Sequence, residues 1–185
     1  MSLLLRALAL AVLMPFLAAP PAATPTSDDR FLGALPWALP DDATPMVVHA
    51  VVDGDTVRLT APGDDWWEPY RIIGIQAPET DGPYTDEECY GPEAKAFLAE
   101  LLPRGSTVYV QRDISNTDRN GRFLRHLFIL DEATGGAYLV AEVLVLGGYA
   151  RARSYPPDDL YDDILAGAQK TADRDNVGLW AACAA

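Results

Sequence analysis

The sequence predicts an α+β protein: a five-stranded, partly open β-barrel with about three helices. Short segments rich in β-branched and aromatic residues recur between turn residues, which is typical of strands. Two other segments carry apolar residues at the spacing of three and four that gives a helix one buried face. The chain has 185 residues, of which 49% are hydrophobic, enough for one core. We therefore expect a single folded domain.

The chain begins with a segment typical of a secretory signal peptide. Residues 1–24 combine an early arginine, Arg6, with an apolar run that gives way to small residues and prolines. The run is shorter than the roughly 18 residues that cross a bilayer, and Pro15 interrupts it, so cleavage is favoured over an uncleaved membrane anchor. We expect a secreted protein, periplasmic or extracellular after signal peptide cleavage.

The stretch between this leader and the first predicted strand is rich in Pro, Ala and Asp. It shows no sustained period, so residues 25–45 are interpreted as a linker or N-terminal arm. Its large apolar residues, Phe31 and Trp37 among them, are candidates for docking on the domain. The domain itself is expected to cover residues 46–183.

Five strands are predicted from their residue types and from the turns between them. Asp53-Gly54 is a strong hairpin signal, and Ala77-Pro78 must end the third strand because proline cannot donate to a ladder. Arg71 and Gln76 lie on opposite faces by parity, so a site that uses both requires a bend, for which Gly74 is the candidate. The five segments are residues 46–52, 55–59, 70–75, 106–111 and 123–131.

Helices are predicted between and after these strands. One begins at Gly91-Pro92-Glu93, with proline in its first turn and a carboxylate near its positive end, and it stops at Pro103. The apolar segment 138–146 can be a buried helix or a strand by periodicity alone. A last helix is expected to open with Pro156-Pro157-Asp158-Asp159. Its buried side is expected to consist of Leu160, Ile164, Leu165 and Ala168.

Strands with helices placed between and after them favour an OB-fold-type barrel, the kind that binds oligonucleotides. The net charge of −13 argues against a protein that coats nucleic acid through bulk electrostatics. A nucleic-acid enzyme of this charge needs a local arginine patch. In an oxidising compartment Cys89 and Cys183 are expected to form a disulfide, with two free thiols as the alternative. With His49 and His126 they make no cluster suited to zinc.

Five short motifs appear in the order of a known family. They are Asp53-Gly54-Asp55-Thr56-Val57, Arg71 followed by Ala77-Pro78-Glu79-Thr80, Tyr90-Gly91-Pro92-Glu93-Ala94, Asp118 through Arg122, and Gly178-Leu179-Trp180. In these motifs the chain resembles the staphylococcal nuclease (thermonuclease) family over about residues 46–183. The resemblance implies a staphylococcal nuclease-like barrel and a secreted enzyme that uses calcium to cut phosphodiester bonds in DNA and RNA. It also implies a helix in the segment 138–146.

The resemblance assigns roles to individual residues. Arg71, Glu79 and Arg122 fall on the family's catalytic arginine, glutamate and second arginine, and Asp55 falls on one of its metal-binding aspartates. Two arginines suit phosphodiester hydrolysis, because guanidinium groups are always charged and grip phosphate oxygens with paired donors. Glu79 is the candidate general base for the attacking water.

The expected metal site departs from the family at two positions. Gln76 stands where the family has a second aspartate, and Ala77 stands where a threonine often contributes its backbone oxygen. Gln76 can offer a neutral amide oxygen and Ala77 its carbonyl, so the site loses one formal negative charge. A divalent metal, with calcium the expected ion, would be held by Asp55, Gln76 and Ala77.

The candidate nucleic-acid contacts are Arg119, Arg151, Arg153 and Tyr155. The arginines would supply the local basic track, and the tyrosine a surface for base stacking. The expected substrate is DNA or RNA, cut with low sequence specificity by a monomer, and no protein partner is implied. The alternative is a nuclease-like module that binds nucleic acid with a lost or weakened metal site, which Gln76 favours. Retention of both arginines and Glu79 favours the enzyme.

Overall fold

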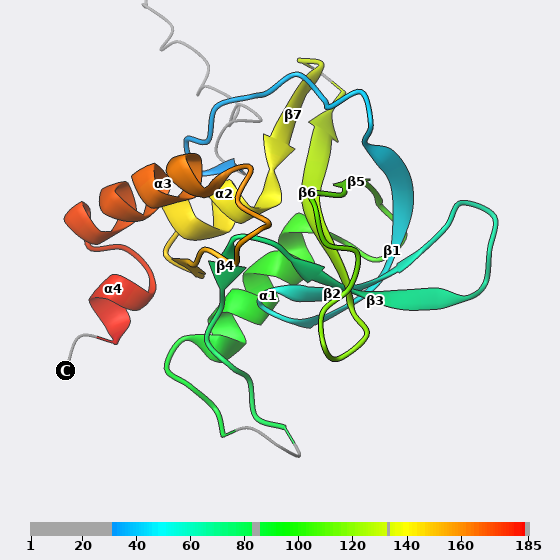
Figure 1. Ribbon diagram of the computed structural model, residues 1–185. Helices are drawn as coiled ribbons and strands as arrows, with labels where there is room; N and C mark the ends of the chain where they lie inside the picture. The colour runs from blue at the N-terminus through cyan, green and yellow to red at the C-terminus, as the bar shows by residue number, and fades with distance from the viewer. Residues whose placement is uncertain (1–30, 83–85, 133, 184–185) are drawn as a thin grey trace, which may run out of the picture.

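A barrel of five strands forms the centre of the computed structural model, which describes residues 31–82, 86–132 and 134–183 (Figure 1). The strands are ordered β3-β2-β1-β5-β6, and a parallel pairing of β3 with β6 closes the sheet on itself. Their bounds are β1 Thr44–Asp53, β2 Thr56–Thr60, β3 Trp67–Ile72, β5 Thr107–Gln111 and β6 Phe123–Asp131. The predicted α+β class and five-stranded barrel are confirmed. The predicted signal peptide lies outside the described residues.

Short strands and helices surround this barrel. β7, Gly136–Leu139, extends the sheet beyond β6, while β4, Ile75–Gln76, and β8, Arg151–Ala152, form a separate antiparallel pair. The helices are α1 Gly91–Leu101, α2 Val140–Leu146, α3 Asp162–Arg174 and α4 Leu179–Ala182. Within the described part of the chain, no helix has the length and hydropathy needed to cross a bilayer.

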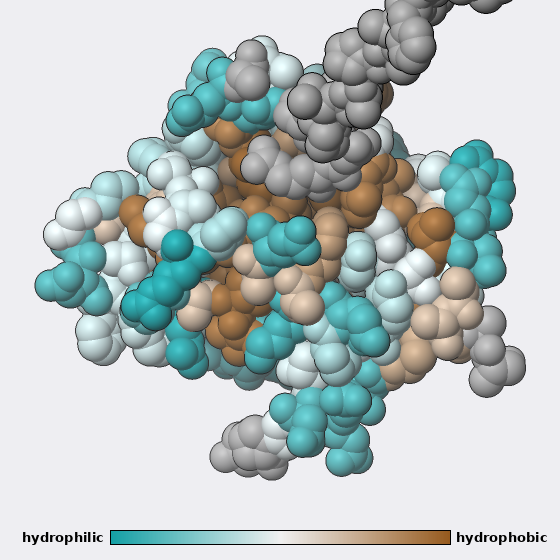
Figure 2. Space-filling model, turned by 180° about the vertical axis from the view of Figure 1, so that it is seen from behind, coloured by the Kyte–Doolittle hydropathy of each residue, from teal (hydrophilic) through white to brown (hydrophobic). Residues whose placement is uncertain are grey.

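The hydrophobic core lies where the barrel meets α1 and α2. Val57 and Leu59 alternate along β2 and are fully buried, as is Ile72 on β3. Ala94 and Leu98 lie one turn apart on the buried face of α1. Seen from behind, hydrophobic side chains gather in the middle of the molecule and hydrophilic ones occupy most of its rim (Figure 2). The described part of the molecule thus has one continuous hydrophobic core.

The apolar segment 138–146 is a strand followed by a helix. Its first residues complete β7, and the chain turns into α2 at Val140. The helix expected from the resemblance is therefore correct only from Val140 onward. α2 is buried along most of its length, from Val140 to Val145. A helix with so little exposed surface needs no polar stripe, which is why periodicity could not distinguish it from a strand.

The last long helix begins later than predicted. Pro156 and Pro157 belong to a turn, and α3 starts at Asp162. Asp158 is buried in this turn, where its Oδ1 accepts the backbone N–H groups of Ile114 at 3.0 Å and Ser115 at 2.6 Å. These bonds tie the turn to the loop after β5. Of the four residues expected on the buried side, Leu165 and Ala168 are buried, whereas Leu160 and Ile164 are exposed.

Gly74 makes the bend that separates Arg71 from Gln76. It has a φ of 82°, and a Cβ at this position would overlap the side chain of Leu165. The bend ends β3 and begins β4, which pairs Gln76 with Arg151 of β8. Two residues that parity places on opposite faces can therefore reach the same site, as predicted.

The N-terminal arm packs on the domain from Phe31 onward. Phe31 is fully buried and stacks on Tyr138, with ring centroids 3.6 Å apart. Trp37 and Ala137 exchange backbone hydrogen bonds of 2.7 and 2.9 Å, and the Trp37 indole donates to Glu142 Oε2 at 3.1 Å. Docking of these two aromatic residues agrees with the sequence prediction, and it extends the packed part of the chain upstream of residue 46.

A disulfide joins Cys89, just before α1, to Cys183, at the end of α4, with the Cα atoms 5.9 Å apart. We expect its reduction to lower the free energy of unfolding by about 4 kcal/mol. The two cysteines are 94 residues apart, and the chain-entropy model assigns a loop of that length about 4 to 5 kcal/mol. Urea unfolding with and without dithiothreitol measures the loss. Reductant must not affect the Cys89→Ser/Cys183→Ser variant, and equal stability of the oxidised and reduced protein would contradict the prediction.

Candidate active site

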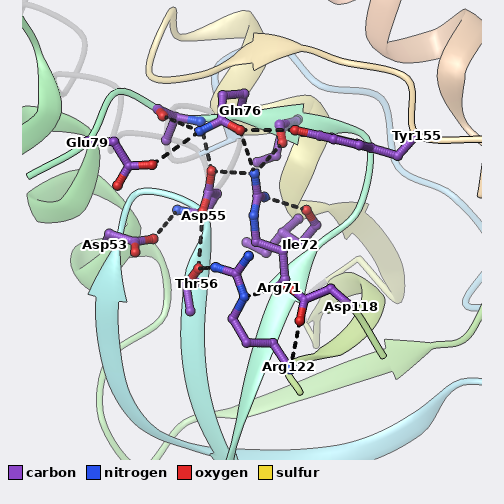
Figure 3. Close-up of polar contacts among 12 residues, drawn as sticks. Asp53, Asp55, Thr56, Arg71, Ile72, Gln76, Glu79, Asp118, Arg122 and Tyr155 are labelled. Carbon is purple, nitrogen blue, oxygen red and sulfur yellow. Dashed lines mark hydrogen bonds and ion pairs between the residues drawn. The ribbon is translucent and has the colours of Figure 1, made fainter. Parts of the chain in front are cut away.

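A cavity of about 590 Å³ opens between the β1–β2 turn, the end of β3 and the turn before β6 (Figure 3). The predicted catalytic and metal-binding residues that line it are Arg71, Glu79, Arg122, Asp55 and Gln76. Asp53 and Asp118, for which the sequence predicted no role, line it as well. Residues from distant parts of the chain therefore meet around one space.

Arg71 is held near the end of β3 by several acceptors. Its Nη2 lies 2.8 Å from Asp55 Oδ2, 2.9 Å from the Ile75 carbonyl oxygen and 3.1 Å from Gln76 Oε1, and its Nη1 donates to the Ile72 carbonyl oxygen at 2.8 Å. The side chain is only 9% exposed. A buried guanidinium group is tolerated only when such partners compensate for lost hydration. Its orientation is therefore fixed before any ligand arrives.

Asp55 faces Arg71 from the β1–β2 turn, directly before β2. Its Oδ2 also accepts the Ala77 N–H at 2.9 Å, and its Oδ1 accepts the Thr56 hydroxyl at 3.1 Å. Burial raises the pKa of the Asp55 carboxyl to about 7, although the neighbouring Arg71 acts to lower it. The charged form of this carboxylate is thus costly unless further positive charge is supplied.

The Gln76 side chain forms hydrogen bonds at both ends of its amide group. Its Oε1 accepts hydrogen bonds from Arg71 Nη2 at 3.1 Å and from the Tyr155 hydroxyl at 3.0 Å. Its Nε2 donates to the Ala77 carbonyl oxygen at 3.2 Å and to Glu79 Oε1 at 3.5 Å. The amide nitrogen, and not the oxygen, therefore faces the carbonyl that the sequence predicts as a metal ligand.

Glu79 is held by backbone contacts with the segment that leads into α1. Its N–H donates to Glu88 Oε2 at 3.0 Å, and its carbonyl accepts the Glu88 N–H at 2.9 Å. Gly91 packs so closely against that carbonyl that a Cβ on Gly91 would overlap it, which explains the glycine. The Glu79 backbone is thereby fixed beside the cavity.

Arg122 is positioned by the turn that precedes β6. Its Nε donates to Asp118 Oδ2 at 2.7 Å, and its Nη1 donates to the Thr56 hydroxyl at 3.1 Å. Partial burial acts to raise the pKa of Asp118, but the hydrogen bonds from Arg122 and from the Asn120 N–H outweigh it and lower the pKa. Because Thr56 in turn donates to Asp55, a chain of hydrogen bonds connects Arg122 to Arg71.

Comparisons with known proteins identify the family of this chain. A family model described as "Staphylococcal nuclease homologue" matches residues 69–182. The chain belongs to the staphylococcal nuclease family. It is on that ground a nuclease, a phosphodiester hydrolase.

Relatives of this nuclease come from several bacteria. The thermonuclease of Staphylococcus intermedius is 34% identical over 134 residues, which are 72% of this chain and 74% of the relative. The thermonuclease of Staphylococcus hyicus is 32% identical over 133 residues, 72% of this chain and 73% of the relative. Endonuclease YncB of Bacillus subtilis is 26% identical over 136 residues, 73% of this chain and 61% of the relative.

Three of the four predicted nucleic-acid contacts line the cavity of the nuclease. They are Arg119, Arg153 and Tyr155. The Arg153 guanidinium lies 5.2 Å from the centroid of the Tyr155 ring. Arg151 is not among the cavity-lining residues; its guanidinium lies 4.3 Å from the Trp180 ring centroid, in a cation–π contact. The structure therefore brings Arg151 to α4 and the other three to the site.

Asp53 and Asp118 were missed although each sits in a recognisable turn. Asp118 Oδ1 accepts the N–H groups of Asn120 at 2.8 Å and Arg122 at 3.0 Å, and Asp53 Oδ1 accepts the N–H of Asp55 at 3.1 Å. Aspartates that bond to a backbone N–H two residues on form Asx-turns. The aspartate–x–asparagine–glycine order at Asp118 is a turn signal that could have indicated a positioning role for this carboxylate.

Proposed function

We propose that this nuclease is a secreted, metal-assisted endonuclease that hydrolyses phosphodiester bonds in DNA, RNA or both with low sequence specificity. The grouping of Arg71, Arg122 and Glu79 around one cavity carries the proposal. Each arginine is oriented by its own aspartate, so two guanidinium groups are pre-positioned for the oxygens of one phosphate. A carboxylate beside them suits a reaction with water better than simple capture, because it repels a bound phosphate.

The residues of the chain account for the main steps of hydrolysis. A phosphate bound between Arg71 and Arg122 would have the negative charge on its non-bridging oxygens neutralised as that charge grows. Glu79 would accept a proton from the water whose oxygen forms the new bond to phosphorus. The bond from phosphorus to the leaving sugar oxygen then breaks, and that oxygen takes up a proton. Because Arg71 is already fixed by its acceptors, little reorganisation accompanies the reaction.

The site suits a hard divalent cation, with calcium the expected ion. Across the described ranges, no group of three or more His, Cys, Asp or Glu residues is arranged to hold a metal, so backbone oxygen and water must complete the ligand set. The buried Asp55 carboxylate and the Ala77 carbonyl would hold the ion, whose charge would offset the cost of burying that carboxylate. The Gln76 oxygen could join them only after leaving Arg71 and Tyr155. A bound ion supplies Lewis-acid stabilisation of the phosphoryl oxygens.

Tyr155, Arg119 and Arg153 would position the nucleic acid around this centre. Tyrosine can stack on any base, and arginine contacts the backbone common to all sequences, so neither favours one sequence strongly. Arg151 would contribute less directly from its place over Trp180. With a net charge of −13, attraction for the polyanion is restricted to this patch. We propose a monomeric enzyme that needs no protein partner.

Secretion is supported by two features of the chain. The N-terminal residues 1–24 have the pattern of a cleavable signal peptide. The Cys89–Cys183 disulfide is a bond that persists in an oxidising compartment and is rare in the cytosol. We propose that the mature enzyme acts in the periplasm or outside the cell.

A nuclease assay with defined metals tests the proposal. The purified, oxidised protein is incubated with single-stranded DNA and with RNA in calcium, manganese or magnesium. We expect cleavage with calcium, and a loss of at least about a hundredfold when a chelator removes it, since a catalytic metal is worth several kcal/mol. The Arg122→Ala protein, purified in the same way, controls for contaminating nucleases. Full activity in chelator would contradict metal assistance.

The orientation of the Gln76 amide also favours a second function, a module that binds nucleic acid without cleaving it. With its nitrogen toward the Ala77 carbonyl, Gln76 offers no oxygen to a cation there. The same assay decides between the two functions. Binding of an oligonucleotide without cleavage in any of the three metals would favour the module.

A further inference from the structure

The Gln76 amide is locked in one orientation by partners on both sides. Arg71 can only donate, and it meets the amide oxygen at 3.1 Å, while the Tyr155 hydroxyl donates to the same oxygen at 3.0 Å. The Ala77 carbonyl and the Glu79 carboxylate can only accept, and they meet its nitrogen at 3.2 and 3.5 Å. Turning the amide over would place N–H groups against the guanidinium and oxygen against oxygen. The contacts with Arg71, Ala77 and Glu79 would become unfavourable together, and only the Tyr155 hydroxyl could adapt, by accepting instead of donating.

The amide hydrogens do part of what a cation would do at this place. They carry partial positive charge between a carbonyl oxygen and a carboxylate oxygen that would otherwise face each other. A carboxylate at position 76 would add a third negative oxygen there and would create a need for a cation. The amide removes that need, because the N–H groups of Gln76 already satisfy Ala77 and Glu79.

The remaining oxygen ligands are also occupied by the protein itself. Asp55 Oδ2 bonds to Arg71 and to the Ala77 N–H, and Asp55 Oδ1 bonds to Thr56. A cation that approaches Asp55 and the Ala77 carbonyl therefore finds both oxygens of the carboxylate and the carbonyl already hydrogen-bonded. Of these donors, the Gln76 side chain is the one bonded to the Ala77 carbonyl, and it can swing away without moving the backbone or breaking the Arg71–Asp55 ion pair.

We propose that Gln76 is a positioning residue that competes with the cation: its amide holds the Ala77 carbonyl and Glu79 in the metal-free enzyme, and a cation must displace it. The inference rests on the proposed metal-assisted function and specifies how that metal is controlled. The enzyme keeps an assembled site without metal, and it requires a higher calcium concentration than the same site would without the amide. Tyr155 strengthens the lock through its bond to the Gln76 oxygen.

The direction in which one substitution changes the affinity for calcium distinguishes this role from that of an ordinary metal ligand. Gln76→Ala removes an oxygen and a competing nitrogen together. If the nitrogen competes, calcium binds about 5- to 30-fold more tightly to the variant, the equivalent of one or two hydrogen bonds that need no longer be broken. If the oxygen is a ligand, calcium binds more weakly. Gln76→Asp removes the competitor and adds a charge, so we expect an increase of about a hundredfold or more.

Isothermal titration of the oxidised protein with calcium alone measures these affinities without any substrate. Thermal unfolding in chelator and in calcium is the second measurement, and we expect Gln76→Ala to be less stable than wild type in chelator and to gain more from calcium. Tyr155→Phe removes one of the hydrogen bonds that hold the Gln76 amide and leaves the proposed metal ligands unchanged. We expect this variant to bind calcium a few-fold more tightly than wild type. Gln111→Ala is the matched control, because Gln111 bonds to Asp42 and Tyr161, away from the cavity.

The proposal is overturned if Gln76→Ala binds calcium as tightly as wild type or more weakly. If Gln76→Ala does not fold, an unchanged calcium affinity of Tyr155→Phe overturns it instead. These results do not depend on cleavage. A protein that cuts no nucleic acid but shows the tighter binding would contradict the proposed function and leave the role of Gln76 supported.

Discussion

Replacing Arg122 by alanine is expected to lower kcat about a thousandfold while the protein stays folded. Removing one pre-positioned donor to a developing oxyanion costs roughly 10²- to 10³-fold, and removing an arginine that stabilises phosphoryl transfer costs more. The side chain is 29% exposed, and an ion pair that is partly open to solvent, such as the one with Asp118, contributes about 1 kcal/mol. The loss should therefore appear in turnover and not in unfolding.

Initial rates on a single-stranded oligonucleotide, measured with a urea unfolding curve for each protein, check this prediction. Arg104→Ala is the matched control, because Arg104 is exposed beyond the end of α1 and does not line the cavity. Arg122→Lys should recover only part of the rate, since lysine keeps the charge but cannot bond to Asp118 and the substrate with the same fork. A kcat within a factor of about three of wild type for Arg122→Ala would remove Arg122 from the reaction.

Replacing Glu79 by glutamine is expected to lower kcat by about 10²- to 10⁴-fold, the range that a positioned general base contributes. The substitution changes little else, because the amide oxygen of a glutamine at position 79 can still accept the hydrogen bond from Gln76 Nε2. Position and shape are kept, and the ability to accept a proton is lost. We therefore expect KM to change little.

The same cleavage assay, with KM and kcat determined separately, measures the effect of Glu79→Gln. Glu100→Gln, on the exposed side of α1, is the control for removing one negative charge from an acidic protein. An unimpaired Glu79→Gln enzyme would show that Glu79 is not the base. A raised KM with an unchanged kcat would assign Glu79 to binding alone.

Much of the barrel and the site follows from local sequence signals. Asp53-Gly54 between two strand-like segments is a strong hairpin signal, and Pro78 has to end the strand before it. This turn and this strand end place Asp55 and Glu79 beside the same cavity. Gly74 could be assigned to a bend because Arg71 and Gln76 cannot share a site without one. Each of these inferences uses chemistry confined to a few neighbouring residues.

The features that were not predicted depend on contacts between distant segments. Asp158 is bonded to the loop after β5, more than forty positions away, and this bond keeps Pro156 and Pro157 in a turn where a helix start was expected. The change from strand to helix at Val140 lies within a buried apolar run, where no polar residue marks the boundary. The orientation of Gln76 depends on Tyr155, 79 positions along the chain.

We propose that Arg122 and Glu79 act together on one phosphate in this cavity. A double-mutant cycle tests this joint action: kcat on one single-stranded oligonucleotide is measured for the wild type, Arg122→Ala, Glu79→Gln and the double variant. Residues that serve the same step are strongly non-additive. We predict that kcat of the double variant is no more than about tenfold lower than kcat of the slower single variant. Losses that multiply in full would mean that the two residues act independently, and this would contradict their joint action on one phosphate.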